Sequence, residues 1–293
     1  MAEGRIIKAL SGFYYVQAGG EVYQCRGRGV FRNRKVTPLV GDFVSFDEND
    51  DGGGYIMNIK ERENELVRPP IANIDQVIII TSAVAPGFSS MLLDRFLVLI
   101  ENKEITPVIF ITKMDAAKEQ EKEEIRQYAE DYQGIGYDVE LLSAKDSQNL
   151  PVLDHYFQDK VTVFAGQSGV GKSSLLNALH PSLLLETGEI SKSLGRGRHT
   201  TRHVELVTVR GGLVADTPGF SALEFAEVEE EELADCFPEM RERKRLCKFR
   251  GCRHHKEPKC AVKEAVETGE IKSYRYEHYL QFLEEIQTRK PRY

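Results

Sequence analysis

The pattern of apolar and polar positions changes near residue 68. Before it, short β-type runs alternate with Gly, Asn and Asp turns, and these runs are residues 5–10, 13–16, 21–25, 42–46 and 55–59. Several short strands at close spacing are typical of a small closed barrel, for which the OB-fold is the commonest candidate. We therefore predict an N-terminal β-barrel over residues 1–68. The dipeptide Pro69-Pro70 then predicts a linker.

Beyond the linker, apolar runs of strand length alternate with helical periodicity. The predicted strands are 76–81, 107–111, 137–142, 161–165, 204–209 and 212–215, and the predicted helices are 91–102, 118–132 and 148–157. This alternation predicts an α/β domain with a mainly parallel sheet over residues 69–225. Residues 226–293 contain helical patterns at 261–268 and 274–288. They are expected to form a mostly helical C-terminal domain.

Composition restricts the class of protein. The chain lacks any apolar run of about 20 residues, so we expect no transmembrane helix. Residues 1–10 include Glu3, Arg5 and Lys8 and have no apolar centre, unlike a secretory signal. A cytoplasmic monomer is the expectation.

The formal net charge of −7 conceals a strong segregation of charge. Residues 224–239 contain eight acidic side chains and no Lys or Arg, whereas residues 241–263 contain ten Lys or Arg side chains and two Glu. Residues 26–35 are also basic and contain no acid. Such patches can bind a polyanion such as RNA although the whole chain is acidic, with a merely solvated basic face as the alternative.

Aromatic residues of the predicted barrel have two possible roles. Tyr14, Tyr15 and Tyr23 lie in or beside its strands. They could bind nucleic acid, as OB barrels often do with an aromatic face, or they could form the barrel core. Both interpretations stay open from the sequence.

A phosphate-binding loop follows the strand at 161–165. Its residues are Gly166, Gln167, Ser168, Gly169, Val170, Gly171, Lys172 and Ser173, and Ser174 continues into a helix. Strand, glycine-rich turn and helix form the context that this motif requires, because backbone N–H groups and the helix N-terminus then face the phosphates. Lys172 is expected to contact the β and γ phosphates and to serve catalysis, and the Ser173 hydroxyl is expected to bind Mg²⁺.

Two further turns resemble the guanine-binding motifs of GTPases. Thr112-Lys113-Met114-Asp115 follows one predicted strand, and Ser143-Ala144-Lys145 follows the next. The Asp115 carboxylate would accept hydrogen bonds from guanine N1–H and the 2-amine, which adenine cannot offer. The Lys113 stem would cover the base. Backbone N–H groups of 143–145 would support guanine O6.

The strand at 212–215 leads into Asp216-Thr217-Pro218-Gly219, which resembles the Walker B and switch motif. Asp216 would hold Mg²⁺ through water, and the Gly219 N–H would face the γ-phosphate. The basic, glycine-rich segment 194–202 resembles a switch that orders around Mg²⁺, with Thr200 or Thr201 as ligand and Thr201 preferred. A simple hairpin is the alternative for this segment.

The order of the motifs is unusual. The guanine motifs precede the phosphate loop, whereas ordinary GTPases have the phosphate loop first. The same strand arrangement can be kept only if the chain is circularly permuted. The segment after Gly219 then leads directly into the C-terminal region, so nucleotide state and that region are expected to be coupled.

Four potential metal ligands lie close together in the C-terminal region. They are Cys247, Cys252, His254 and Cys260, with His255 as a possible substitute for His254. Three thiolates and one imidazole suit tetrahedral Zn²⁺, and a disulfide is less expected in a cytoplasmic chain. Cys25 and Cys236 remain as ordinary thiols.

A barrel, a permuted GTPase and the spacing Cys-x₄-Cys-x-His-x₅-Cys together resemble the RsgA family of bacterial GTPases, over essentially the whole chain. The Thr at position 112 matches this family's form of the guanine motif. The resemblance implies an OB-fold, a GTPase that uses GTP and Mg²⁺, and one structural Zn²⁺. It also implies late maturation of the small ribosomal subunit, with ribosomal RNA as the partner.

The resemblance also bears on catalysis. Phe220 stands where many GTPases have a water-orienting Gln, and phenylalanine cannot hydrogen-bond to water. The isolated enzyme is therefore expected to be slow. The resemblance points to His199 as the catalytic group, which ribosomal RNA would bring to the attacking water. Activation by K⁺ is not expected, because Gly169 replaces the Asn of cation-dependent GTPases.

Two other classes of function remain as alternatives. The chain could be a nucleotide-gated RNA-binding module whose hydrolysis is incidental. It could also be an ATP-dependent nucleic-acid enzyme, which Asp115 opposes.

Overall fold

The computed structural model describes residues 1–29, 31, 36–49, 53–143, 152–180, 204–216 and 223–289. The chain divides into two compact units, and each combines two separate stretches of sequence. The first unit contains residues 1–78 and 144–221, and the second contains residues 79–143 and 222–293. The three domains with boundaries at 68 and 225 stay a prediction. Within the described residues, no helix is long and apolar enough to cross a membrane.

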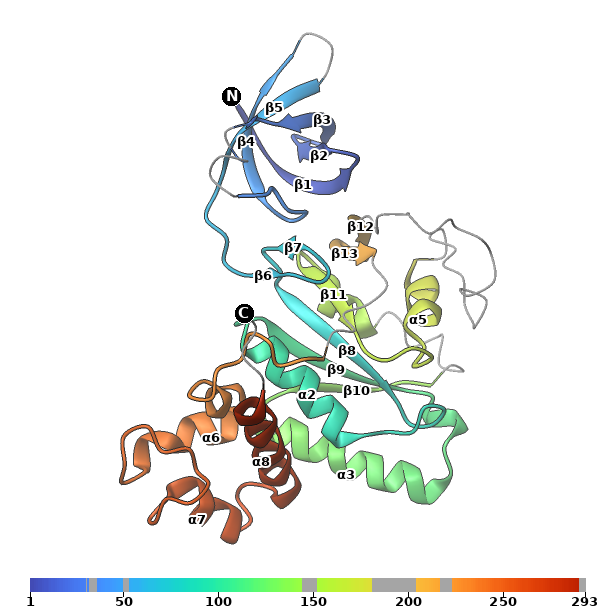
Figure 1. The fold of residues 1–293 in the computed structure, drawn as a ribbon. Helices are drawn as coiled ribbons and strands as arrows, with labels where there is room; N and C mark the ends of the chain where they lie inside the picture. Colours follow the sequence, from blue (N-terminus) through green and yellow to red (C-terminus); the bar gives the residue numbers. More distant parts are fainter. Residues whose placement is uncertain are drawn as a thin grey trace. The chain divides into compact units, whose positions relative to one another are not determined.

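The N-terminal part of the first unit is the predicted barrel (Figure 1). Its strands are β1 (Ala2–Leu10), β2 (Phe13–Ala18), β3 (Glu21–Gly27), β4 (Phe43–Glu48) and β5 (Gly53–Ile59). They pair in the order β1-β2-β3-β5-β4, and β1 also pairs with β4, which closes the barrel. Only β3 and β5 pair in parallel. This pairing confirms the predicted OB-type barrel.

The barrel core consists mainly of aliphatic side chains. Its fully buried members are Ile6, Val16, Cys25, Val44, Phe46 and Ile56. Tyr14, Tyr15 and Tyr23 are each half-buried. Tyr23 packs against Phe46, with 5.1 Å between the ring centroids, so it closes the edge of the core. None of the three is a fully buried core residue, and their role in nucleic-acid binding stays a prediction.

The segment predicted as a linker contains ordered structure. Strands β6 (Glu65–Leu66) and β7 (Ile71–Ala72) form a short antiparallel hairpin around Pro69-Pro70. The Asn64 side chain accepts from Ile74 N at 2.8 Å and donates to Ile74 O at 2.9 Å. The Asn73 side chain accepts from the backbone N of Glu63 at 3.0 Å. These hydrogen bonds hold the segment in a defined conformation, whereas Pro69-Pro70 alone predicted a linker.

The rest of the first unit carries the phosphate-loop strand. The first residues of β8 (Gln76–Ser82) belong to it, with β11 (Val161–Ala165), β13 (Gly212–Asp216) and β12 (Glu205–Val209) next in order. β11 and β13 are parallel, and β12 is antiparallel to β13. The helices are α4 (Asp154–Phe157) and α5 (Lys172–Leu179). The predicted helix 148–157 is thus confirmed only at its end, because 148–151 lie outside the described residues.

The second unit contains the end of β8 and the parallel strands β9 (Thr106–Thr112) and β10 (Asp138–Leu141). Helix α2 (Ser90–Glu101) follows β8, and α3 (Glu119–Ile135) follows β9. Ser89 caps α2 by accepting a bond from Leu92 N at 3.3 Å. The left-handed backbone of Gly136, with φ 112°, ends α3.

The C-terminal part of the second unit is helical, as predicted. It contains the 3-10 helices η5 (Leu233–Cys236) and η6 (Lys244–Leu246) and the α-helices α6 (Pro238–Arg243), α7 (Ala261–Glu267) and α8 (Ser273–Thr288). Phe237, Tyr279 and Phe282 are fully buried at its centre. Figure 1 shows α8 lying beside α2 in this unit.

A buried ionic cluster joins these helices. Arg275 on α8 is 1% exposed, and its Nε and Nη2 donate to the two carboxylate oxygens of Glu239 at 2.8 and 3.1 Å. Its Nη1 donates to Asp94 on α2. Asp94 also accepts from the Tyr132 hydroxyl at 2.5 Å and lies 2.6 Å from His278 Nδ1. Every strong donor and acceptor here has a partner, so the buried charges are tolerated.

Replacing Arg275 by Met should lower the free energy of unfolding by about 3–5 kcal/mol, because two carboxylates would lose their buried cation. The control is Arg126→Met, which breaks the exposed pair with Glu123 on α3. That change should cost about 0–1 kcal/mol. Urea unfolding monitored by circular dichroism measures both. Equal effects of the two substitutions would contradict the role given to the buried cluster.

Candidate nucleotide and metal sites

The predicted phosphate loop joins β11 to α5. All five residues of β11 are buried, which anchors the start of the loop. Gly166, Gly169 and Gly171 have φ values of 134°, 84° and 100°, a backbone region that favours glycine. Gln167, Ser168 and Gly169 are exposed at the loop surface. This conformation turns the chain sharply from the strand into the N-terminus of α5.

Lys172 is the first residue of α5, and its side chain folds back over the loop. Its ammonium group donates to the carbonyl oxygens of Gly166 at 2.7 Å and Gln167 at 2.5 Å. Burial lowers the pKa of Lys172 from its ordinary value. A partly desolvated ammonium group held by neutral carbonyls gains more from an anionic partner than a solvated one does. Ser173 and Ser174 follow in the first turn of the helix.

Asp216 ends β13, which is parallel to the phosphate-loop strand β11. The carboxyl ends of the two strands therefore lie at the same edge of the sheet, where ligands of α/β proteins bind. His199, Thr200, Thr201, Gly219 and Phe220 lie outside the described residues, so their predicted roles stay predictions.

The first guanine motif follows β9 in the second unit. The Thr112 hydroxyl donates to Thr81 O at 3.1 Å, so this side chain is turned toward β8. Met114 N donates to Leu142 O at 3.1 Å, which links the turn to the end of β10. Asp115 is exposed, and Ser143 follows directly after Leu142. The structure thus brings the two predicted motifs together at neighbouring strand ends, while Ala144 and Lys145 lie outside the described residues.

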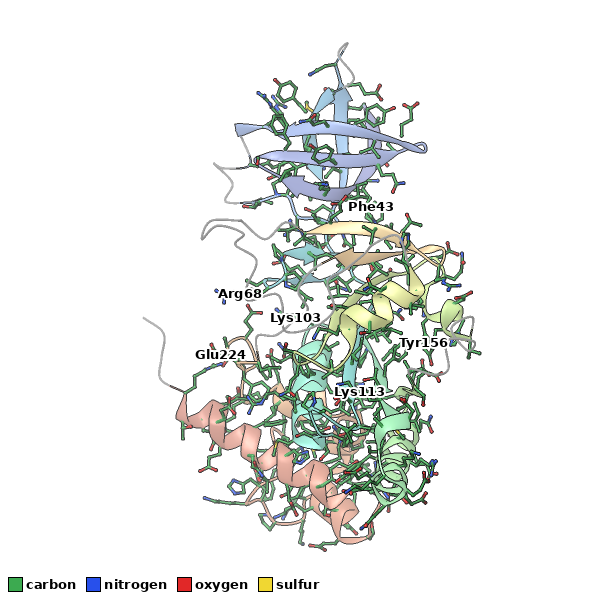
Figure 2. The ribbon with its side chains drawn as sticks, turned by 90° about the vertical axis from the view of Figure 1, so that its right-hand side faces the viewer. Phe43, Arg68, Lys103, Lys113, Tyr156 and Glu224 are labelled. Atoms are coloured by element: carbon green, nitrogen blue, oxygen red, sulfur yellow. The ribbon has the colours of Figure 1, made fainter. Side chains whose placement is uncertain are left out.

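Lys113 (labelled in Figure 2) is fixed at both ends. Its backbone is left-handed, with φ 60°, and its ammonium group donates to Ala85 O at 2.5 Å. The Ala85 loop is itself held by the buried Ser82 hydroxyl, which donates to Pro86 O at 2.7 Å. The aliphatic part of the Lys113 side chain is therefore held at both its backbone end and its ammonium end. The contact with Ala85 O could not be predicted from the sequence, because a backbone carbonyl acceptor leaves no pattern in the residue types.

The predicted metal ligands of the second unit converge. One ligand atom from each of Cys247, Cys252, His254 and Cys260 lies within 4.8 Å of the others. The Cys247 and Cys260 sulfurs are 3.9 Å apart, and His254 Nδ1 lies 3.5 and 3.3 Å from them. Tetrahedral zinc with usual bond lengths places two sulfurs roughly 3.8 Å apart, and a sulfur and a nitrogen roughly 3.6 Å apart. The distances fit such a site.

The protonation chemistry of this cluster also fits a metal. Burial lowers the pKa of His254, which favours the neutral imidazole that binds metals. Burial also raises the pKa of the Cys252 thiol to about 12 and raises that of Cys260. Without a cation these thiols would stay protonated in an apolar setting, whereas a divalent metal stabilises the thiolate.

Neighbouring side chains orient the cluster. The Tyr276 hydroxyl donates to His254 O at 2.6 Å, and the Tyr279 hydroxyl donates to Arg253 O at 2.7 Å. His254 is fully buried, whereas His255 is exposed and its N–H donates to Glu257. Of these two histidines, the structure places His254 in the cluster with the three cysteines. Neither tyrosine was predicted to contact the cluster, although their i, i+3 spacing places them on one helix face.

The remaining cysteines are buried thiols, and the structure contains no disulfide among the five described cysteines. Burial raises the pKa to about 11 for Cys25 and about 12 for Cys236. Both thiols are therefore protonated and unreactive at neutral pH. This agrees with their prediction as ordinary thiols.

Comparison with known families gives two matches. A model described as RsgA GTPase matches residues 59–226, and one described as RsgA N-terminal domain matches residues 3–56.

Two similar proteins align over the full length of both chains. The small ribosomal subunit biogenesis GTPase RsgA 2 of Oceanobacillus iheyensis is 69% identical, covering 100% of each chain. The small ribosomal subunit biogenesis GTPase RsgA of Bacillus subtilis is 63% identical, again covering 100% of each.

Two solved structures share this fold. YloQ, described as a circularly permuted GTPase, has a TM-score of 0.86 and 59% identity, covering 100% of this chain and 97% of its own. YjeQ from Thermotoga maritima has a TM-score of 0.88 and 38% identity, covering 99% of each chain. The permuted order of motifs in this chain therefore agrees with its similarity to a solved structure described as circularly permuted.

Proposed function

The chain belongs to the RsgA GTPase family and is a P-loop enzyme that hydrolyses GTP, and we propose that it is a late-stage maturation factor of the small ribosomal subunit. In this proposal the subunit stimulates hydrolysis of GTP to GDP and phosphate, and the chain binds ribosomal RNA. The observation that carries it is the full-length match to proteins named small ribosomal subunit biogenesis GTPases.

The described residues support guanine-nucleotide chemistry. The glycine-rich turn presents backbone N–H groups at the start of α5, where phosphate oxygens bind in P-loop proteins. Lys172 exchanges its two carbonyl acceptors for phosphate oxygens and neutralises charge as the γ-phosphate leaves. Asp115 selects guanine, and the anchored Lys113 stem covers the base.

Magnesium belongs to the same proposal. Ser173 and Asp216 stand at the positions that bind Mg²⁺ directly and through water, with Thr201 as a further ligand. When bound, Mg²⁺ neutralises the charge that develops between the β and γ phosphates. His199 orients the attacking water when ribosomal RNA is bound. GTP hydrolysis by the isolated enzyme is slow, because Phe220 offers no hydrogen bond to that water.

The first test measures GTP turnover alone, with isolated small subunits, and with large subunits as a control. Small subunits should stimulate the wild type, whereas Lys172→Ala should lower turnover by about 10²–10³-fold. His199→Ala should lose the stimulated rate and retain nucleotide binding. Equal turnover under all three conditions would contradict subunit coupling. Full subunit maturation by Lys172→Ala would favour the alternative of an RNA-binding module.

Asp115→Asn should change base selectivity from guanine to xanthine. The amide oxygen still accepts from N1–H, but the amide N–H₂ now needs an acceptor, which xanthine O2 supplies and the guanine 2-amine does not. GTP binding should weaken roughly 10- to 100-fold, and xanthosine triphosphate binding should strengthen. Competition titrations measure both, and the exposed Glu119→Gln on α3 is the control. Unchanged selectivity would contradict the role of Asp115.

Zinc is the metal we propose for the Cys/His cluster, with Cys247, Cys252, His254 and Cys260 as ligands. Elemental analysis of the purified chain should find one zinc per chain. His254→Ala should remove most of it and lower the midpoint of thermal unfolding, whereas the neighbouring His255→Ala should keep it. Full zinc content in His254→Ala would contradict the ligand assignment.

A further inference from the structure

The loop between β8 and α2 lies against the start of the first guanine motif. We call residues 82–89 the Ser82 loop, after the last residue of β8. Ala83 N donates to Thr112 O at 2.9 Å, and the Thr112 hydroxyl donates to Thr81 O at 3.1 Å. The ends of the neighbouring strands β8 and β9 are therefore tied together where the guanine motif begins.

Two consecutive carbonyl groups of the Ser82 loop accept hydrogen bonds from side chains. The Ser82 hydroxyl donates across the loop to Pro86 O at 2.7 Å. The Lys113 ammonium group donates to Ala85 O at 2.5 Å. Ser82 is fully buried, whereas Ala85 is exposed. The buried hydroxyl therefore fixes the carbonyl group adjacent to the one that binds Lys113.

Backbone strain is found at both residues of the lysine contact. Ala85 and Lys113 have φ values of 46° and 60°, a left-handed region that residues other than glycine rarely adopt. Such conformations persist only where surrounding contacts fix them, and they are concentrated at ligand sites. One such contact is the Ser82 hydroxyl bond, and another is the Phe88 ring, which packs on Tyr128 of α3 with 5.2 Å between the ring centroids. The loop is thus held in the conformation that presents the Ala85 carbonyl to Lys113.

This anchoring affects the entropy of nucleotide binding. A lysine side chain is flexible, and holding it extended costs conformational entropy. When the ammonium group is already bound to Ala85 O, part of that cost arises during folding and does not weaken the binding of a ligand. Without the Ser82 bond, the Ala85 carbonyl would move more freely, and the stem of Lys113 would have to be ordered by the nucleotide.

We propose that Ser82 is a positioning residue for the guanine nucleotide. Its hydroxyl holds the Ser82 loop so that Ala85 O keeps the Lys113 stem over the face of the base. The inference rests on the proposed function, in which the Lys113 stem covers the base. Because Ser82 acts through Lys113, its contribution to affinity depends on the Lys113 ammonium group and disappears without it.

The experiment is a double-mutant cycle on the full chain, with affinity for GDP measured by titration calorimetry. Lys113→Met keeps an aliphatic stem but removes the ammonium group. Ser82→Ala and Lys113→Met should each weaken GDP binding about 3- to 10-fold, the range for loss of one hydrogen bond. The double variant should bind GDP like Lys113→Met alone, because the two residues act in series. Losses that multiply would show independent roles and would overturn the proposal.

Inosine diphosphate separates positioning of Lys113 from general damage to the motif. It lacks the 2-amine assigned to Asp115 but offers a similar purine face to the Lys113 stem. Ser82→Ala should therefore weaken the binding of GDP and of inosine diphosphate by the same factor. A larger loss for GDP would mean that Ser82 acts on Asp115, which contradicts the proposal.

The matched control is Ser89→Ala, at the other end of the Ser82 loop. The Ser89 hydroxyl accepts from Leu92 N at 3.3 Å and so caps α2. This variant should lower the midpoint of thermal unfolding and bind GDP like the wild type. Equal losses of GDP affinity in Ser82→Ala and Ser89→Ala would show a general weakening of the loop, and the positioning role would be wrong.

Three outcomes separate this inference from the proposed function. If Ser82→Ala binds GDP like the wild type while Lys113→Met binds it weakly, the inference fails and the proposed function stands. If Lys113→Met binds GDP like the wild type, the proposed role of Lys113 fails, and the inference fails with it. If small subunits do not stimulate wild-type turnover, the proposed subunit coupling fails, and the double-mutant cycle still decides the role of Ser82.

Discussion

The second unit depends on one buried guanidinium group. Arg275 is tolerated in an apolar interior only because Asp94 and Glu239 both accept its hydrogen bonds. This requirement places α8 against α2 and α6 in one arrangement, since a shift of a helical turn would leave a charge unpaired. Helix α2 also follows the loop whose Ala85 carbonyl binds Lys113. The same helix therefore connects the guanine motif to the ionic cluster.

Helix α8 contacts two different parts of the second unit through side chains on two of its faces. Arg275 and His278 face the carboxylate of Asp94, while Tyr276 and Tyr279 hold the backbone around His254. The Cys/His loop and helix α2 are thus positioned by one rigid element of the same unit. A metal bound in that loop would stabilise the backbone to which Tyr276 and Tyr279 donate. This arrangement supplies a physical basis for linking the C-terminal helices to the strands that carry the guanine motif.

Most of the fold and the main motifs could be predicted because their signals are local. Buried strands, turn glycines and closely spaced ligands each act within a few residues. The Arg275 cluster could not be predicted, since a charged residue in a helix usually indicates a solvated face and its partner Asp94 lies 181 positions away. The position of His254 within the Cys/His cluster also depends on tertiary contacts.

The long separation between Asp94 and Arg275 has a consequence for biosynthesis. At about 5–20 residues per second, a ribosome adds Arg275 roughly 10 to 40 seconds after Asp94. During that interval the carboxylate of Asp94 lacks the guanidinium group that compensates its charge in the folded unit. The barrel, by contrast, is complete early in synthesis, because its strands all lie within residues 2–59. The strands of the N-terminal barrel are therefore all synthesised well before helix α8, which completes the second unit.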